Sequence, residues 1–262
     1  MPEGDTVYAA AKRLDKGLTG QVLTKSDFRI PSLATSDISG ATVIGTISRG
    51  KHLLTRFDNG LTLRTHLKME GIWHVHPLRT RWRRPAHTAR VVLRTATTEA
   101  VGFQVILDLV RSEKEDDLVG HLGPDLLGPD WDAEEALARL RADPTAPIGD
   151  ALLEQRNLAG VGNVFKSEIC FLGGVHPLTP VAAVPDLPAM VAKSKQLLEV
   201  NKDRPTRITT GDKRRGYQLW VYGRRGPCLR CGTPIQKADQ GPPGQQRPTY
   251  WCPTCQPPYP GG

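Results

Sequence analysis

The first apolar pattern in the chain has the period of an α-helix. Apolar residues between positions 7 and 18 recur every three or four residues, which places them on one face of a helix. Asp5 or Thr6 precedes this run and is a suitable N-cap. We therefore expect a few extended residues and then a short helix, whose apolar face is formed by Val7, Ala10, Ala11, Leu14 and Leu18.

From about residue 21 to residue 110 the pattern changes to short apolar-rich runs that are typical of β-strands. Asp58-Asn59-Gly60 separates two of these runs, and this sequence favours a tight turn. Several short strands at this spacing predict a β-sandwich or a β-barrel. A basic loop, Arg79–Arg84, contains one aromatic residue. The predicted strands are 43–47, 53–57, 61–65, 90–94 and 101–109.

After residue 120 the helical pattern returns. Residues 121–131 are rich in Gly, Pro and Asp and are interpreted as a linker between a first domain, 1–120, and a helical domain, 132–222. Asp132 with Glu135 resembles a capping box that opens a helix ending near Arg141. Further helices are expected at 149–155, from Gly162 to Phe171 and after Asp186. Residues 201–216 are polar, basic and without a clear period, and are expected to form a mobile loop.

Composition and charge narrow the function classes. Hydrophobic residues make up 39% of the 262 residues and charged residues 24%, which excludes a membrane protein and argues against wholesale disorder. The N-terminus lacks the features of an export signal, so the reducing cytoplasm is the expected compartment. Residues 201–262 hold 11 Lys and Arg but three Asp and Glu. This excess suggests a polyanion partner, and a solvated basic tail is the alternative.

Four of the five cysteines form two C-x-x-C pairs with 20 residues between them. Each pair offers two thiolates across a tight turn, and two pairs complete a tetrahedral site for one structural Zn²⁺. Disulfides are the alternative, but they are disfavoured in a reducing compartment. The fifth cysteine, Cys170, is interpreted as a small buried apolar side chain. The predicted zinc ligands are Cys228, Cys231, Cys252 and Cys255.

The segment from Leu153 to Asn163 has the outline of a helix, a glycine-bearing turn and a second helix. Gly160 and Gly162 permit close backbone approach, and free N–H groups at the start of the second helix can bind phosphate. Asn163 adds a side-chain donor at that point. Such a turn can also merely connect two helices, but a basic hairpin beside it favours phosphate binding.

The N-terminus carries a third candidate for chemistry. Removal of Met1 would expose the secondary amine of Pro2, and the positive end of the following helix favours the neutral, nucleophilic form of that amine. Glu3 stands beside it and can move protons. An amine nucleophile with a carboxylate can form an imine at a sugar carbon. The sequence Met-Pro-Glu also occurs by chance in many proteins.

Five motifs together resemble the formamidopyrimidine-DNA glycosylase/endonuclease VIII family of base-excision repair enzymes, and especially its actinobacterial endonuclease VIII-like branch. The resemblance covers essentially the whole chain. The motifs occur in order as Met1-Pro2-Glu3-Gly4, Ser48-Arg49-Gly50-Lys51, His66-Leu67-Lys68-Met69-Glu70-Gly71, Gln155-Arg156-Asn157-Leu158-Ala159-Gly160-Val161-Gly162-Asn163 and the Cys₄ array.

The resemblance implies an α+β fold with an N-terminal β-sandwich and flanking helix, a helix-two-turn-helix domain, and a zinc β-hairpin over 223–262. It implies a monomeric, bifunctional DNA glycosylase and AP lyase that acts on damaged double-stranded DNA. Pro2 would attack C1′ of the damaged nucleotide, Glu3 would protonate the sugar ring oxygen, and Lys51 would hold a phosphate and assist catalysis. The resemblance further implies that Met69 fills the space of the everted nucleotide and that Asn163 and Arg247 bind backbone phosphate, with Arg247 counted among the catalytic residues as well.

The chain also departs from the family pattern. Thr6 stands where much of the family has a glutamate, and the charged residues Lys68 and Glu70 flank Met69. No Arg-Arg-Phe-Gly segment occurs around 105–120, although the purine-directed branch uses one to contact the base opposite the lesion. Its absence favours oxidised pyrimidines as substrates. The alternatives are an oxidised-purine glycosylase of the same family, a non-catalytic binder of damaged DNA, and a zinc-ribbon protein, which would leave the N-terminal domain unexplained.

Overall fold

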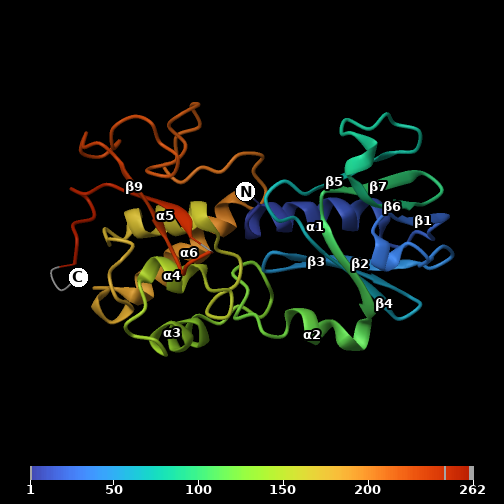
Figure 1. The fold of residues 1–262 in the computed structure, drawn as a ribbon, viewed down its shortest axis with the longest axis horizontal. Coiled ribbons are helices and arrows are strands. Elements are labelled where there is room, and N and C mark those ends of the chain that lie inside the picture. Colours follow the sequence, from blue (N-terminus) through green and yellow to red (C-terminus); the bar gives the residue numbers. More distant parts are fainter. Residues whose placement is uncertain (1, 245, 260–262) are drawn as a thin grey trace. The chain divides into compact units, whose positions relative to one another are not determined.

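The computed structural model describes residues 2–244 and 246–259, and the chain divides into two compact units, residues 1–121 and 122–262. Figure 1 shows strands in the first unit, and helices with one hairpin in the second. Within the described residues, no helix has both the length and the apolar character needed to cross a membrane. Each unit is described below by itself.

Unit 1 contains two antiparallel four-stranded sheets. One sheet has the order β1-β6-β7-β5 and the other the order β2-β3-β4-β8. Apolar side chains from both sheets join one buried core, so the predicted β-sandwich is confirmed. The strands are β1 (Lys25–Phe28), β2 (Val43–Arg49), β3 (His52–Phe57), β4 (Leu61–His66), β5 (Ile72–Pro77), β6 (Ala89–Arg94), β7 (Thr98–Phe103) and β8 (Ile106–Arg111).

The strand predicted at 101–109 is two strands, β7 and β8, which belong to different sheets. The chain changes sheets at Gln104, whose φ of 52° ends the extended conformation. Apolar residues lie on both sides of Gln104 and both halves face one core, so 101–109 resembles a single strand with isolated polar residues inside it. Strand β5 was not predicted separately, since its sequence alternates apolar residues with His74 and His76.

Helix α1 (Gly4–Leu18) covers the side of the sandwich where both sheets end, because it packs on the edge strands β2 and β5. The predicted apolar face of this helix is buried. The predicted N-cap, Asp5 or Thr6, is wrong: the helix begins at Gly4 and Glu3 is the N-cap. Asp5 lies inside the first turn, where its side chain accepts a hydrogen bond from the backbone N–H of Thr6 (2.7 Å).

Two hydrogen bonds show that α1 and β2 run in opposite directions. The N–H of Gly20 donates to the carbonyl of Val43 (2.8 Å), and the N–H of Thr46 donates to Oδ1 of Asp15 (3.0 Å). A helix rises about 1.5 Å per residue and a strand about 3.3 Å per residue. Because the two elements run in opposite directions, the start of α1 and the end of β2 both lie in the same direction from the Asp15–Thr46 contact. The start of α1 is about 16 Å away from it.

Three connections of the sandwich lie at this same end of unit 1. Arg49 pairs with His52, and His52 pairs with His66, so the β2–β3 and β4–β5 turns are neighbours. His66 also pairs with Ile106, which brings the β7–β8 connection to the same place. The N-terminus of α1 and these three connections therefore form one end of the unit, called here the turn end.

Unit 2 is built from four α-helices around an apolar core, with a two-stranded antiparallel hairpin of β9 and β10. Asp132 caps its first helix by accepting from the N–H groups of Glu134 and Glu135, and Asp186 caps α6 through the N–H of Ala189. The elements are α3 (Ala133–Arg141), α4 (Ile148–Leu153), α5 (Asn163–Leu172), α6 (Leu187–Asn201), β9 (Gln236–Gln240) and β10 (Arg247–Trp251). Unit 2 also contains the short helix η4 (Val181–Ala183). The short helices of unit 1 are η1 (Pro31–Leu33), η2 (Ala86–Thr88), η3 (Ser112–Lys114) and α2 (Glu115–Val119).

Much of the segment 121–131, expected as a linker, is packed into unit 2. Residues 122–126 are buried, and the backbone of Leu126 and Ala159 is joined by a hydrogen bond of 3.1 Å. A Cβ on Gly123 would lie 2.5 Å from the carbonyl oxygen of Arg156, so glycine is required there for close packing. Gly and Pro in this segment therefore permit backbone contact in addition to turning the chain.

We expect Asp15→Ala to lower the free energy of unfolding by about 1–3 kcal/mol, because it leaves the N–H of Thr46 on an edge strand without its acceptor. Urea denaturation followed by circular dichroism measures this change. Lys16→Ala, an exposed change on the same helix, is the control and should stay within about 0.5 kcal/mol of the wild type. Equal stability of the two variants would contradict the anchoring role of Asp15.

Candidate active site and nucleic-acid interface

The predicted amine and its carboxylate lie at the start of α1, at the turn end of unit 1. Pro2 is half-buried and Glu3 is buried, and the Glu3 carbonyl accepts the first helical hydrogen bond, from the N–H of Val7 (3.0 Å). The unpaired N–H groups of a helix start give this end a partial positive charge. Removal of Met1, on which the amine depends, concerns a residue outside the described part of the chain.

Lys51 occupies the two-residue turn between β2 and β3, at the same end. Gly50 has a φ of 56°, a conformation that tight hairpin turns require and that glycine adopts without strain. Two histidines that sequence reasoning did not single out lie next to this turn, with the ring centroids of His52 and His66 5.0 Å apart. Burial, and then nearby positive groups, lower the pKa of His52 to about 3 and that of His66 to about 4. Both rings are therefore neutral near pH 7.

Met69 lies at the tip of the turn between β4 and β5 and is 61% exposed. Lys68 has a φ of 49°, and its N–H donates to Nδ1 of His66 (3.0 Å), which fixes the turn. A Cβ at Gly71 would lie 2.4 Å from the Leu67 carbonyl oxygen, so the turn closes only with glycine. An apolar side chain held in solvent on a rigid turn can insert between bases as a wedge.

In unit 2, the side chain of Gln155 holds the connection between α4 and α5. Its Nε2 donates to the carbonyls of Leu153 (2.7 Å) and Val161 (3.0 Å), and its Oε1 accepts from the N–H of Gly160 (3.1 Å). Gly160 has a φ of 115°, which favours glycine. One side chain thus fixes both turns of the helix-two-turn-helix and presents the start of α5.

The two predicted phosphate contacts of unit 2 lie next to each other. Asn163, the first residue of α5, is 1% exposed and donates through Nδ2 to the carbonyl of Pro248 (2.6 Å). Pro248 follows Arg247, which is exposed at the start of β10. Lys166, fully buried one turn later, donates to Oγ1 of Thr249. Asn163 therefore holds the hairpin in place beside Arg247. Its predicted role was a phosphate contact, and this structural role was not predicted.

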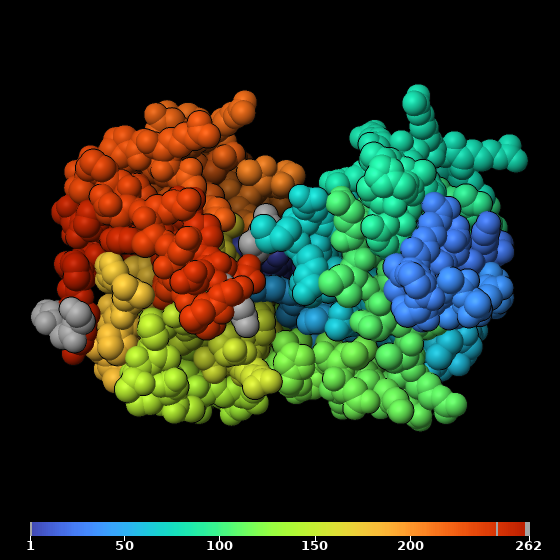
Figure 2. Space-filling view, viewed as in Figure 1, coloured from blue at the N-terminus to red at the C-terminus, as the bar shows by residue number. Residues whose placement is uncertain are grey.

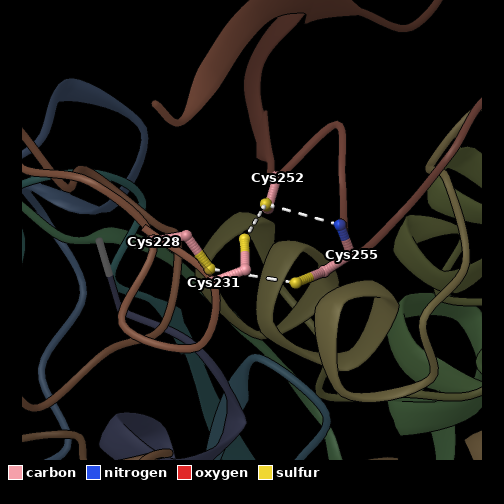
Figure 3. A group of neighbouring side chains, drawn as sticks. All are labelled: Cys228, Cys231, Cys252 and Cys255. Atoms are coloured by element: carbon pink, nitrogen blue, oxygen red, sulfur yellow. Dashed lines mark hydrogen bonds between the residues drawn. The ribbon is translucent and has the colours of Figure 1, made fainter. Parts of the chain in front are cut away.

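The four predicted metal ligands come together at the base of the hairpin (Figure 3), and their sulfur atoms all lie within 4.8 Å of one another. The Sγ atoms of Cys231 and Cys252 are 3.4 Å apart and those of Cys228 and Cys255 are 4.0 Å apart. Four ligands at about 2.3 Å around a tetrahedral ion are separated by roughly 3.8 Å, so the cluster can hold a metal ion.

The charge of the cluster also fits a cation. Hydrogen bonds with Thr233 lower the pKa of Cys231 to about 6, whereas burial and the neighbouring thiols raise the pKa of Cys255 to about 12. Four thiolates at this spacing repel one another unless a positive ion lies between them. The N–H groups of Arg230 and Cys255 approach the Sγ atoms of Cys228 (3.4 Å) and Cys252 (3.5 Å), which further stabilises thiolates.

Glu168 is a residue that sequence reasoning missed. It is fully buried on α5, where burial raises its pKa. It accepts from the N–H groups of Trp220 (2.8 Å), Val221 (2.9 Å) and Tyr222 (2.9 Å) and from Oγ1 of Thr209. The signal in the sequence was an acidic residue whose neighbours one helical turn away, Val164, Phe165, Phe171 and Leu172, are all apolar. Its contacts tie the segment that precedes the metal cluster to the helix-two-turn-helix.

Comparison with known proteins agrees with these features. Residues 1–106 match the model of the formamidopyrimidine-DNA glycosylase N-terminal domain. The chain is 56% identical to a probable endonuclease 8 2 of Streptomyces coelicolor, over 100% of this chain and 97% of that protein. The chain belongs to the formamidopyrimidine-DNA glycosylase/endonuclease VIII family. It is also 47% identical to the DNA-(apurinic or apyrimidinic site) lyase Nei2 of Mycolicibacterium smegmatis, over 98% and 99% of the two chains.

Solved structures agree on the fold of this family. The chain has a TM-score of 0.80 to a Lactococcus lactis formamidopyrimidine-DNA glycosylase bound to DNA with an AP site, at 23% identity and over 98% and 100% of the two chains. A similar TM-score, 0.81 at 24% identity and over 98% and 100%, relates it to the wild-type Lactococcus enzyme in complex with DNA that contains an oxidised pyrimidine. These likenesses support the fold, whereas the roles of individual site residues remain predictions.

Proposed function

We propose that the chain excises oxidised pyrimidines from double-stranded DNA with the N-terminal amine of Pro2 and then cuts the abasic site. As a member of its family the chain is a DNA glycosylase with AP lyase activity. The observation that carries the finer proposal is the antiparallel packing of α1 on β2, which brings Pro2 and Glu3 to the same end of unit 1 as Lys51 and Met69.

The chemistry follows from an amine and a carboxylic acid at one sugar. The lone pair of the Pro2 nitrogen forms a bond to C1′ of the damaged nucleotide, while the bond from C1′ to the base breaks and the base leaves with a proton. Glu3 protonates the ring oxygen as the C1′–O4′ bond opens, which leaves an iminium ion between the protein and C1′. The iminium acidifies the C2′ hydrogens, so the 3′-phosphate and then the 5′-phosphate leave by β- and δ-elimination.

The sugar carbon is out of reach inside the base stack, so the nucleotide must rotate outward at a cost of a few kcal/mol. Met69, exposed on its rigid turn, is suited to fill the vacated space, and Lys51 is suited to hold a neighbouring phosphate. Arg247, exposed on the hairpin that Asn163 holds in place, would bind the backbone from unit 2. These contacts keep the duplex bent, which offsets part of the energy of eversion.

The substrate choice rests on the β7–β8 connection. Only Gln104 and Val105 lie between Phe103 and Ile106, so this connection is too short to carry a base-contacting loop. The purine-directed branch, by the resemblance described above, uses an Arg-Arg-Phe-Gly segment around 105–120 to contact the base opposite the lesion, and here these positions hold β8, η3 and α2 without that sequence. Oxidised pyrimidines such as thymine glycol and dihydrouracil are therefore the favoured substrates over 8-oxoguanine.

We expect borohydride to trap a covalent complex between the chain and a duplex with one thymine glycol, because reduction converts the iminium to a stable amine. Pro2→Gly, which replaces the secondary amine, should lower trapping at least about tenfold, and Glu3→Gln should lower excision while DNA binding persists. Gel electrophoresis and mass spectrometry of the trapped peptide measure this.

Lys114→Ala, an exposed change in a short segment after β8, is the matched control and should trap at the wild-type rate. Trapping through a residue other than Pro2 would contradict the proposed nucleophile. Binding without any trapping would favour the alternative of a non-catalytic damage-binding protein.

A panel of single-lesion duplexes tests the substrate class. We expect single-turnover excision of thymine glycol, dihydrouracil and 5-hydroxycytosine to be at least about tenfold faster than excision of 8-oxoguanine opposite cytosine, which corresponds to about 1.4 kcal/mol in the transition state. An abasic duplex is the control, since its cleavage needs no base recognition. Faster excision of 8-oxoguanine would instead favour the oxidised-purine glycosylase.

We propose that the cysteine cluster holds one structural Zn²⁺, since all four ligand positions come from the protein and no position stays open for catalysis. Elemental analysis should give one zinc per chain. A strong chelator should lower the melting temperature and weaken DNA binding, because the hairpin that carries Arg247 loses its support. Cys170→Ser is the control and should retain the metal, since Cys170 lies outside the cluster. Full DNA affinity in the metal-free protein would contradict this role.

A further inference from the structure

The basic loop 79–84 is held to unit 1 by its one aromatic residue. The indole N–H of Trp82 donates to Oε1 of Glu99 (2.7 Å), and its ring packs edge-to-face on Phe103 with centroids 5.6 Å apart. The guanidinium of Arg29 lies over the indole ring of Trp82, 5.2 Å from its centroid. With Trp82 fixed in this way, Arg81 and Arg83 on either side of it are exposed.

These two arginines line a surface pocket of about 450 Å³ along the edge strand β5. Its lining comes from the loop, from five consecutive residues of β5, 72–76, and from Arg13 of α1, which adds a third guanidinium. In Figure 2 the segment around residues 79–85, coloured teal, projects from the surface of unit 1. The lining residues are Arg13, Ile72, Trp73, His74, Val75, His76, Thr80, Arg81 and Arg83.

The pocket is positive and contains no carboxylate to balance that charge. Among the ion pairs of the described residues, none involves Arg13, Arg81 or Arg83. Burial, and then the positive groups around it, lower the pKa of His74, so its ring is neutral near pH 7 and can donate a hydrogen bond to an anion. Glu99, whose Oε1 lies 3.8 Å from Nε2 of the lining residue His76, already accepts from Trp82 and Arg94.

A chain of hydrogen bonds connects the loop to the turn that carries Met69. Arg84 donates to Oε1 of Gln104 (3.0 Å), and Nε2 of Gln104 donates to Oε2 of Glu70 (3.0 Å). Ile72, which lines the pocket, follows the last residue of that turn, Gly71. The pocket residues of β5 begin directly after this turn and extend over about 13 Å of strand, so a polyanion that lies over Met69 can continue along them.

We propose that the pocket formed by Arg13, Arg81 and Arg83 binds a backbone phosphate of duplex DNA that flanks the lesion. This inference rests on the proposed function only in taking DNA as the polyanion. Guanidinium groups donate in a fork that matches phosphate oxygens, and three of them around one pocket favour a phosphodiester over a single monovalent ion. The pocket thereby lengthens the DNA contact of unit 1 beyond the Met69 turn.

The test compares Arg81→Ala/Arg83→Ala with Arg111→Ala/Lys114→Ala in the full chain. The control pair removes the same charge, and Arg111 ends β8 away from the turn end. Each protein is titrated with a duplex of about 30 base pairs, ~100 Å long, that contains a tetrahydrofuran abasic analogue, at several salt concentrations. We expect the first pair to weaken binding about 3–10-fold and to lower the slope of log K against log salt by about 1, since one phosphate contact is lost.

The control pair should keep the wild-type slope, and both variants should keep the wild-type circular dichroism spectrum. Arg81→Lys/Arg83→Lys should recover part of the slope, because charge returns without the guanidinium fork. A second readout is NMR of the imidazole: bound DNA should raise the pKa of His74 in the wild type, because a phosphate offsets the nearby arginines. Equal slopes for the two Ala pairs, or an unchanged pKa of His74, would overturn the proposal.

Failure of this inference is distinguishable from failure of the proposed function. Single-turnover excision by the wild type tests the proposed function alone, whereas the salt slopes of the variants test the pocket, which does not contain Pro2, Glu3 or Lys51. A wild-type chain without excision of any lesion, but with the expected difference in slope, would refute the proposed function and retain the pocket. Normal excision with equal slopes would refute the pocket alone.

Discussion

The arrangement of unit 1 depends on how α1 is fixed against the edge strand β2. Oδ1 of Asp15 accepts the outward N–H of Thr46, and the N–H of Gly20 donates to Val43, so the helix can lie along this strand in only one direction. An edge strand otherwise presents unpaired backbone groups to solvent. The same contact therefore protects the sandwich edge and sends Pro2 and Glu3 toward the turns that hold Lys51 and Met69. The position of the predicted nucleophile is thus a consequence of the packing of α1 on the edge strand β2.

In unit 2, buried polar side chains likewise fix the position of one element, the hairpin, against a helix. On α5, Asn163 and Lys166 donate to β10, and Glu168 accepts three backbone N–H groups from residues 220–222. A buried polar group without a partner costs about 1–3 kcal/mol, so each of these bonds favours one position of the hairpin. The helix that follows the two turns is therefore also the support of the metal cluster and of Arg247. This explains why polar residues occur on a helix that is otherwise apolar.

The sequence allowed the sandwich, the helices and the cysteine cluster to be predicted, because their signals are local: strand-length apolar runs, helical spacing and two C-x-x-C pairs. The change of sheet at Gln104 was missed, since the residues on both sides face one core and a single polar residue does not by itself end a strand. The helix start at Glu3 was missed because Asp5 and Thr6 are better N-caps by residue type. Glu168 and the pair His52 and His66 were missed because their partners are distant in sequence, and only the folded chain brings them together.

The positive charge at the turn end comes from lysine and arginine side chains, because the buried histidines there are neutral. Burial keeps His52 and His66 neutral, so the positive charge beside the β2–β3 turn belongs to Lys51 and to Arg49, the last residue of β2. The neutral Nδ1 of His66 can accept the N–H that shapes the Met69 turn. Along β5 the ring of His74 is likewise neutral, while Arg13, Arg81 and Arg83 carry the charge. A neutral His74 adds no charge to the repulsion among these arginines, and the lining of the pocket contains no carboxylate. An acid placed among the arginines would pair with the cations and compete with DNA phosphate. A neutral donor such as His74 therefore suits a surface that binds a polyanion better than a carboxylate does.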